Sequence, residues 1–366
     1  MKNLKIVLTG GPCGGKTTSI QKIEEEFTEK GYQVLIVPEA ATLLINSGIK
    51  PFGNNCLSMY EFQKYVMSTQ MYLESLATKC AEETETPTLI ICDRGLLDDK
   101  AYVSESEFEQ LLKEFNQKEF KLMSRYDLVI HLKTAADGKE EFYTLANNNS
   151  RTETPEEARQ KDQKTLNSWL GHEKLVIIGN DTDFQNKIAK VIQTIHALTD
   201  KEYPIQKQEK YLVEVDKEAL MSLNPVIHHI EQYVIADSDS EYIYRKTTKK
   251  NDTKYTLITK KDTSLNDERI VTRRNISEKE YLSRVPQNQK PIRKTRYCFP
   301  YENQYFRLDI FEDGLEVLEI EETNKTKKRT IPKCITLFEN ISEDPSYRNR
   351  ALYEKYNAKA TEYVKK

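Results

Sequence analysis

Apolar positions in residues 1–200 alternate between short continuous runs and longer stretches with a helical period. The short runs predict buried strands, which we place at Ile6–Leu8, Val34–Val37, Thr88–Cys92, Leu128–Leu132 and Leu175–Ile178. The longer stretches predict helices, including one from Ser58 to Glu83 and one from Phe184 to Leu198. Strands that alternate with helices indicate a parallel sheet with helices on both faces.

The pattern changes after the polar segment 200–204, where short alternating runs replace the helical stretches. Eight such runs at this spacing predict an antiparallel barrel, with strands at Tyr211–Val215, Val226–Ile235, Tyr242–Thr247, Tyr255–Lys260, Glu268–Arg273, Ile292–Phe299, Tyr305–Phe311 and Leu315–Ile320. We expect one helix at Ser277–Leu282 and a C-terminal helix at Pro345–Val364. The sequence therefore predicts two domains, residues 1–200 and residues 205–366.

The loop after the first strand has the spacing Gly10-x4-Gly15-Lys16-Thr17, which is a complete phosphate-binding loop. Glycines let successive backbone N–H groups surround phosphate oxygens, and the following helix adds its positive N-terminal end. Lys16 would reach the β- and γ-phosphates, and the Thr17 hydroxyl would hold Mg²⁺. The expected nucleotide contacts are Gly10, Gly11, Pro12, Cys13, Gly14, Gly15, Lys16, Thr17 and Thr18. The alternative is a glycine-rich turn without a ligand.

Two acidic residues follow predicted strands at the same edge of the sheet, where ligands of such sheets bind. Asp93 comes directly after Thr88–Cys92, so we expect it to be catalytic, together with Lys16, and to meet the Mg²⁺ shell. Its alternative role is to cap the next turn. Glu39 ends the second strand and would position a substrate or a metal-bound water, although a carboxylate at a helix N-terminus looks the same in sequence.

The segment from Asn147 to Arg159 has the features of a lid. Thr154 can cap a helix that begins with Pro155, and Glu157 completes a capping box. Arg151 and Arg159 would then reach the phosphates as catalytic cations. The alternative is a surface helix whose charges pair at i,i+4 spacing.

Basic residues fall inside the strands of the second domain, where they would give a barrel a positively charged interior. An interior of this kind suits a phosphorylated ligand, since cations and phosphates form charge-assisted hydrogen bonds. The expected anion-binding set is Lys210, Arg245, Lys260, Arg293 and Arg296. The alternative is that these charges lie on solvated faces.

Composition limits the remaining possibilities. The 366-residue chain has a formal net charge of −3, which argues against a protein that coats nucleic acid. Its six cysteines include no C-x-x-C, so we expect neither a zinc site nor a disulfide framework. No stretch approaches ~20 apolar residues, so we expect no membrane-spanning segment. The scattered cysteines indicate reduced thiols and a cytosolic or nuclear setting, and we expect a cytoplasmic protein.

Several motifs together resemble the P-loop domain of the TRPL translocation defect family, which is distantly related to nicotinamide-riboside and thymidylate kinases. The resemblance covers residues 1–200 and rests on Gly10–Thr18, Asp93–Asp98, Thr134–Gly138, Phe142-Tyr143, Arg151–Arg159 with Asp162, and Gly179–Phe184. It implies nucleotide binding, with GTP as the preferred nucleotide. The sequence has no signature such as N-K-x-D that would distinguish GTP from ATP, so ATP is the alternative. It also implies that Asn180 and Phe184 lie near the base.

The same family joins this domain to a CYTH-like domain, a triphosphate tunnel built as an eight-stranded barrel. Residues 205–350 resemble it through Lys210–Val213, Tyr255–Lys260, Lys294–Tyr297, Leu308–Phe311 and Leu318–Glu321. The resemblance implies metal binding at Glu319 and Glu321. Alignment on Lys210, however, puts Gln206 and Gln208 where catalytic members have glutamates. Neutral amides bind Mg²⁺ more weakly than carboxylates, so we expect a domain that binds a phosphorylated anion without hydrolysing it.

Three functions remain open. The first is a regulated nucleotide-binding protein, with slow hydrolysis as an option, whose barrel holds a polyphosphate or a phosphoinositide headgroup in membrane trafficking, as the resemblance implies. A peripheral membrane contact would follow from such a headgroup. The second is a small-molecule kinase that acts on a nucleoside-like or riboside-like acceptor. The third is a scaffold subunit of a larger assembly that keeps a structural nucleotide.

Overall fold

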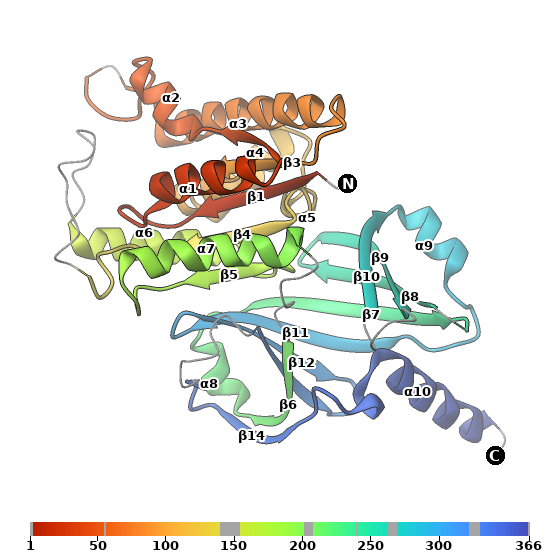
Figure 1. Cartoon of the computed structure of the whole chain (residues 1–366). Helices are drawn as coiled ribbons and strands as arrows, with labels where there is room; N and C mark the ends of the chain where they lie inside the picture. The colour runs from red at the N-terminus through yellow and green to blue at the C-terminus, as the bar shows by residue number, and fades with distance from the viewer. Residues whose placement is uncertain are drawn as a thin grey trace. The chain divides into compact units, whose positions relative to one another are not determined.

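The computed structural model describes residues 3–54, 56–139, 154–200, 208–238, 240–262, 269–321 and 330–364, without the side chains of 208, 262, 269, 270, 321 and 359–364. The chain divides into two compact units, Met1–Gln206 and Lys207–Lys366. Each unit has its own sheet (Figure 1). The described residues include no helix long and apolar enough to cross a membrane.

The first unit contains a parallel sheet of five strands in the described residues, in the order β2-β3-β1-β4-β5. The strands are β1 (Leu4–Thr9), β2 (Gln33–Val37), β3 (Thr88–Asp93), β4 (Leu128–Leu132) and β5 (Leu175–Ile178). Each of the five predicted strands is confirmed. In the register, Leu8 pairs with Asp93 and Thr9 pairs with His131, so the carboxyl ends of β1, β3 and β4 reach one edge together.

Helices cover both faces of this sheet, as the sequence predicts (Figure 1). They are α1 (Lys16–Glu29), α2 (Ala40–Asn46), α3 (Met59–Glu82), α4 (Glu105–Glu114), α5 (Glu119–Met123), α6 (Pro155–Ser168) and α7 (Phe184–Thr199), with a 3₁₀ turn η1 at Asp98–Ala101. One face packs on α1 and α7, through Ile23, Phe27, Val191 and Ile195. The other face meets α3 and the end of α6, where Glu74 pairs with Lys5 of β1 and the Trp169 ring lies against Gly95.

The second unit is built on an antiparallel sheet. Its described strands run in the order β10-β9-β8-β7-β11-β12-β13-β6-β14. They are β6 (Gln208–Val215), β7 (Val226–Ala236), β8 (Ser240–Lys249), β9 (Asp252–Asp262), β10 (Arg269–Ile276), β11 (Ile292–Tyr301), β12 (Gln304–Phe311), β13 (Glu316–Glu321) and β14 (Ile335–Asn340). The predicted antiparallel strands are confirmed, and β14 is an additional one. In the described part of the chain the edge strands β10 and β14 do not pair with each other, so the expected closure into a barrel is not seen.

Helical segments accompany this sheet: the short α8 (Lys217–Met221) and α9 (Glu278–Arg284), a 3₁₀ turn η3 (Pro345–Tyr347) and the longer C-terminal α10 (Asn349–Val364). The last helix packs on the sheet through Leu352 and Tyr353, in a core with Val234, Ile243 and Ile292. The predicted C-terminal helix is therefore confirmed.

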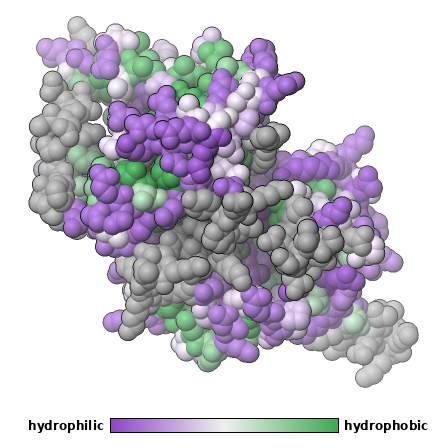
Figure 2. All heavy atoms as spheres, in the orientation of Figure 1, coloured by the Kyte–Doolittle hydropathy of each residue, from purple (hydrophilic) through white to green (hydrophobic). Residues whose placement is uncertain are grey.

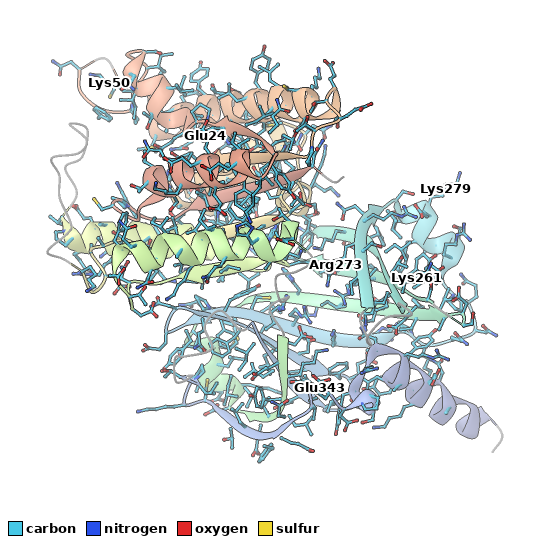
Figure 3. The ribbon with its side chains drawn as sticks, in the orientation of Figure 1. Glu24, Lys50, Lys261, Arg273, Lys279 and Glu343 are labelled. Carbon is cyan, nitrogen blue, oxygen red and sulfur yellow. The ribbon has the colours of Figure 1, made fainter. Side chains whose placement is uncertain are left out.

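Charged side chains cover much of the surface of both units. Figure 2 shows a face on which hydrophilic residues predominate, with smaller hydrophobic areas between them. Glu24 on α1 and Lys279 on α9 are two of the exposed charged residues labelled in Figure 3. This surface agrees with a sequence in which 31% of residues are charged.

Candidate nucleotide-binding site

The loop between β1 and α1 has a conformation that requires glycine. Gly10 has a φ of 134°, and a Cβ atom added there would lie 2.1 Å from the carbonyl oxygen of Leu132. A Cβ on Gly14 would lie 2.7 Å from the same oxygen. The loop therefore passes close to the end of β4, and side chains at these two positions would push it out of place.

Gly15 connects this loop to a second wall of the site. It is the N-cap of α1, with a left-handed φ of 91°, and α1 begins at Lys16. A Cβ on Gly15 would lie 2.8 Å from the ring of Phe184, the first residue of α7. The Phe184 ring is 47% exposed, so one part of it packs on the loop and the rest remains accessible.

A cavity of about 1080 Å³ opens beside the loop. The predicted residues from Pro12 to Thr18, together with Asp93, Asn180 and Phe184, all line it. Gly10 and Gly11 instead lie behind the loop, since the Gly10 carbonyl accepts from Arg94 and the Gly11 N–H donates to Asp162. The sequence thus identified one wall of the cavity, with these two glycines in supporting positions.

Lys16 lies at the centre of the charged end of the cavity. Its Nζ atom donates to the carbonyl oxygens of Gly10 at 3.4 Å and Gly11 at 3.3 Å. Burial and the nearby Arg94 lower the pKa of Lys16, while Asp93 and Glu39 act in the opposite direction. This lysine is held in the loop by backbone oxygens, and phosphate oxygens would be stronger partners for it.

Asp93 is the last residue of β3 and lines the same cavity. Its Oδ1 atom is buried and has no hydrogen-bond partner among the described residues. Burial raises the pKa of Asp93 above its usual value, although Lys16 opposes that shift. An unpartnered carboxylate oxygen in the cavity that Thr17 also lines fits Mg²⁺, which takes oxygen ligands.

Arg94 joins the residues at the edge of the sheet into one network. Its guanidinium donates to Glu39 and to the Gly10 carbonyl, and it lies 3.6 Å from Asp98. Burial raises the pKa of Glu39, but Arg94 and Lys16 outweigh it and lower that pKa to about 2. Glu39 is therefore ionised at any working pH, and it also accepts from the Thr42 hydroxyl at 2.6 Å.

Asp98 is the buried anchor of this network. Its carboxylate accepts from the Thr9 hydroxyl at 2.7 Å and from the Trp169 indole N–H at 2.6 Å. Asp98 is 2% exposed. Through these contacts Asp98 connects β1, the end of α6 and the arginine that lines the cavity.

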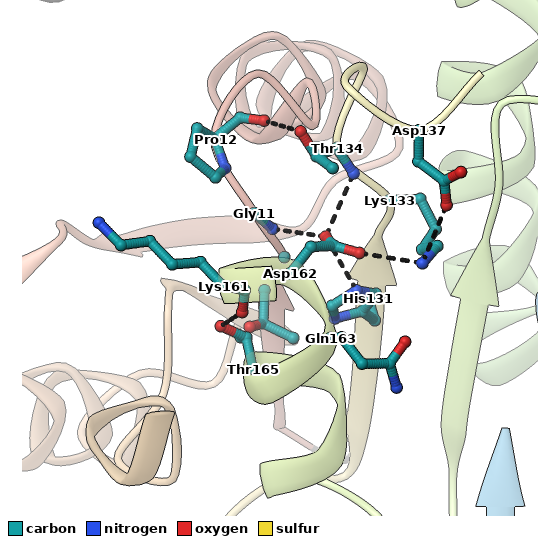
Figure 4. A network of polar contacts seen from close by, with 12 residues as sticks. Gly11, Pro12, His131, Lys133, Thr134, Asp137, Lys161, Asp162, Gln163 and Thr165 are labelled. Carbon is teal, nitrogen blue, oxygen red and sulfur yellow. Dashed lines mark hydrogen bonds and ion pairs between the residues drawn. The ribbon is translucent and has the colours of Figure 1, made fainter. Parts of the chain in front are cut away.

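Asp162 on α6 is a second buried carboxylate, at the back of the loop (Figure 4). Its Oδ1 atom accepts from the backbone N–H of Gly11 at 2.8 Å and of Thr134 at 3.2 Å. Asp162 also lies 3.2 Å from His131 and 3.1 Å from Lys133. Burial raises the pKa of Asp162, but His131 and Lys133 lower that pKa well below its usual range. The family resemblance includes Asp162 among its residues but gives it no role, and its contact with the loop could not be read from the sequence.

Helix α6, which the sequence predicts to be part of a lid and which we call the lid helix, presents to the cavity a different cation from the one expected. The Arg159 guanidinium donates to the Ala136 carbonyl at 2.7 Å and to Glu156 at 2.8 Å. Lys161, two residues further along α6, lines the cavity, as does Lys139. The capping box of Thr154 and Glu157 is present as predicted. Arg151 lies outside the described residues.

Asn180 supports the wall near Phe184. Its amide nitrogen donates to the carbonyls of Thr134 at 2.7 Å and Asp137 at 2.9 Å, and its oxygen accepts from Lys187 at 2.7 Å. Burial lowers the pKa of Lys187 to about 8. Since these bonds occupy the Asn180 amide, Asn180 holds two loops together. Of the two residues predicted to lie near a base, Phe184 is the one with an accessible side chain.

A profile of the AAA domain matches residues 5–187, which is half of the chain. The chain belongs to the AAA domain family. The first unit is therefore a nucleotide-binding P-loop domain, in agreement with the geometry of Lys16 and the loop. None of the curated proteins searched matches the chain.

The unit that follows the AAA domain carries the predicted anion-binding residues, and the strand register sorts them by face. Glu319 pairs across the strands with Lys210 and Arg307, and Arg296 pairs with Asp309. Further along the sheet, Arg245 lies opposite Gln232 and Lys260 opposite Glu241, on the same face. Arg293 occupies the other face, 3.9 Å from Glu231 and 3.8 Å from Glu312. The structure thus brings Lys210 and Arg296 together, and it separates Arg293 from them.

The carboxylate of Glu319, one of the two expected metal ligands of this unit, forms ion pairs with basic side chains. Glu319 lies 3.0 Å from Arg296, 3.5 Å from Arg307 and 3.5 Å from Lys210. Despite burial, Arg296 and Lys210 lower the pKa of Glu319 well below its usual value. The side chains of Gln208 and Glu321, and all of Gln206, lie outside the described residues. No group of three or more His, Cys, Asp or Glu suited to a metal is found in the part of the chain that the structure describes.

Proposed function

We propose that the AAA domain binds a nucleoside triphosphate together with Mg²⁺ and acts on its γ-phosphoryl group. The observation that carries this proposal is that Lys16, Thr17, Asp93 and Lys161 line one cavity. Lys16 would hold the β- and γ-phosphates at the N-terminal end of α1, where the helix dipole favours negative charge. Lys161 would approach the same phosphates from the lid helix.

Thr17 and Asp93 are the residues that would hold Mg²⁺. When bound there, the metal would supply positive charge that neutralises the phosphates. The unpartnered Oδ1 atom of Asp93 supports this assignment. Glu39 is already bound to Arg94 and Thr42, so it serves to fix Arg94 beside the loop.

The base of the nucleotide would stack on the accessible part of the Phe184 ring. Stacking on an aromatic ring tolerates any base. The preference for GTP therefore rests on the sequence resemblance, and ATP is the alternative. Two carboxylates in the loop before Phe184, those of Asp181 and Asp183, could recognise guanine. Both already have partners on α7, because Lys190 lies 3.3 Å from Asp181 and the backbone N–H of Asn186 donates to Asp183.

Calorimetry on the full chain tests this proposal. We expect MgGTP and MgATP to bind with one site per chain, and the affinity to fall at least tenfold when EDTA removes Mg²⁺. Mass spectrometry of the freshly purified native protein identifies any nucleotide that copurifies with it. Absence of binding for both nucleotides would overturn the proposal.

We further propose that the second unit binds a phosphorylated anion, such as polyphosphate or a phosphoinositide headgroup, without hydrolysing it. One face of its sheet carries the cations Lys210, Arg245, Lys260, Lys294, Arg296 and Arg307, and the carboxylates that pair with members of this set are Glu241, Asp309 and Glu319. This excess of positive charge supports an anion site, and the ion pairs of Glu319 argue against metal-dependent hydrolysis. A role in membrane trafficking would follow from a phosphoinositide ligand.

The second proposal is tested by titrating tripolyphosphate into the full chain carrying Lys16→Ala, which removes binding at the AAA domain, and measuring the affinity. We expect affinity to fall as salt rises, because salt screens charge pairs. Arg245→Ala should weaken binding, whereas Arg293→Ala on the opposite face should not. Equal effects of the two variants would contradict the assignment of the face.

A further inference from the structure

The cavity of the AAA domain extends well beyond the phosphate loop. One part of it is lined by the loop, Lys161 and Phe184, and another part by α2, α3 and the residues around η1. Pockets for a single small ligand span about 300–1,000 Å³, so a volume of about 1080 Å³ leaves room beside the nucleotide. We call the part between α2, α3 and η1 the acceptor chamber.

The outer wall of the acceptor chamber is apolar. Phe62 and Val66 of α3 are 3% and 7% exposed, and they pack against α2 beside Ile45. Phe52 and Met59 are 45% and 43% exposed and also line the cavity. Aromatic and thioether side chains of this kind suit a flat, weakly polar ring.

The inner end of the chamber is polar and buried. Asp99 of η1 is 6% exposed, and its Oδ2 atom has no hydrogen-bond partner among the described residues. Burial and the neighbouring Asp98 raise the pKa of Asp99 well above its usual value. The Gln63 amide, 4% exposed, lines the cavity as well. A buried polar atom without a partner is costly, and a ligand hydroxyl would supply the missing bond.

The charges at the chamber exclude an anionic ligand. Among the described residues that line this part of the cavity, Arg94 is the one cation, and Glu39 and Asp98 already neutralise it. A phosphate or carboxylate would face these two acidic groups with no cation of its own. A ligand with hydroxyl groups and no negative charge meets no such penalty.

We propose that the acceptor chamber binds a nucleoside and that the AAA domain transfers the γ-phosphoryl group of the nucleotide to a sugar hydroxyl. The flat base would lie between Phe62, Met59 and Phe52, and the sugar hydroxyls would meet Asp99 and Gln63. This inference rests on the proposed nucleotide site and adds the identity of the acceptor.

The transfer balances as a simple exchange of bonds. The bond between the γ-phosphorus and the bridging oxygen breaks, and its electron pair stays on the nucleoside diphosphate. A new bond forms between that phosphorus and the acceptor oxygen. The hydroxyl proton passes to solvent water. No oxidant or reductant takes part.

The test uses the full chain with MgATP and MgGTP and three groups of acceptors: ribonucleosides and deoxyribonucleosides, the corresponding 5′-monophosphates, and ring-free polyols. Mass spectrometry detects the phosphorylated product, and calorimetry measures nucleotide affinity in parallel. Val66→Trp fills the chamber, and Tyr72→Trp is the matched control on α3, because Tyr72 is 65% exposed. Met59→Trp blocks the same chamber from a more exposed position if Val66→Trp does not fold.

We expect a phosphorylated nucleoside from the wild-type protein and from Tyr72→Trp, and at least a tenfold loss of product in the chamber variants with nucleotide affinity unchanged. Product from monophosphates or polyols instead would overturn the assignment of the acceptor. Nucleotide binding without any nucleoside product would overturn transfer while leaving the nucleotide site intact. Absence of nucleotide binding would overturn both proposals at once.

Discussion

The carboxylate of Asp162 accepts a hydrogen bond of 2.8 Å from the backbone N–H of Gly11, 151 residues away in the sequence. A residue of the lid helix therefore holds the phosphate-binding loop from behind. Lys161 is the residue directly before Asp162 on the same helix and lines the cavity. Consecutive Cα atoms lie about 3.8 Å apart, so this contact also fixes where Lys161 enters the site.

Replacement of Asp162 tests this contact. Asp162→Asn keeps an oxygen for the Gly11 N–H but removes the charge that faces Lys133. Breaking a buried ion pair costs about 3–5 kcal/mol, and we expect a loss of unfolding free energy of about 3 kcal/mol, because Lys133 keeps Asp137 at 3.1 Å. Urea denaturation measures this loss. In the double variant with Lys133→Met the loss should be smaller than the sum of the single losses, and simple additivity would refute the coupling.

Replacement of Lys16 should remove nucleotide binding. Hydrogen bonds to charged groups contribute about 1.5–3 kcal/mol each, so Lys16→Ala should weaken nucleotide affinity by at least about tenfold per bond lost. Circular dichroism should remain unchanged, since Lys16 contacts only carbonyl oxygens of its own loop in the hydrogen bonds described above. Equal affinity of variant and wild type in calorimetry would show that Lys16 does not bind phosphate.

The two cations of the lid helix should behave differently. Lys161→Ala should lower the turnover of the γ-phosphoryl group by about 10²-fold, the usual effect of removing one group that stabilises the developing charge. Arg159→Ala is the matched control, because its guanidinium is bound to Ala136 and Glu156. Single-turnover rates at saturating nucleotide separate this effect from binding. A larger loss in Arg159→Ala would restore the arginine to the role that the sequence suggested.

The stability of the AAA domain should depend on Glu39 at acidic pH. Its pKa is about 2 in the folded state and near 4.5 otherwise. A depressed carboxylate pKa stabilises the fold above the unfolded value, and this contribution is lost as pH falls toward 2. The contribution is at most about 3 kcal/mol at neutral pH. Unfolding free energies of wild type and Glu39→Gln should therefore converge between pH 5 and pH 3, and a constant difference would contradict the shifted pKa.

Much of the AAA domain was predictable, because its signals are local in sequence. The run Leu128–Leu132 and the spacing of Gly10, Gly15 and Lys16 are each readable within a few residues. The role of Asp162 was not, since it depends on a contact that only folding creates. The lining of the acceptor chamber could not be predicted for the same reason, because Phe52, Phe62 and Asp99 come from three separate segments of the chain.

In the second unit, the sequence did not determine which face of a strand each residue occupies, and it did not reveal strands with weak alternation of apolar and polar residues. Shifting a strand position by one residue moves the side chain to the opposite face, which is why Arg293 and Arg296 were grouped although they lie on different faces. Strand β14 was missed because it barely alternates: Leu337 and Phe338 are 37% and 64% exposed. Closure of a barrel depends on the pairing of edge strands, which no local pattern specifies.

The hydrogen bond between Trp169 and Asp98 has a practical consequence. The sequence contains a single tryptophan, so all indole fluorescence of the protein comes from one fully buried ring. That ring is 2.6 Å from the carboxylate that pairs with Arg94 in the cavity wall. The molecule therefore carries an intrinsic optical reporter one residue removed from its own binding site, and we expect its emission to change when the cavity is occupied.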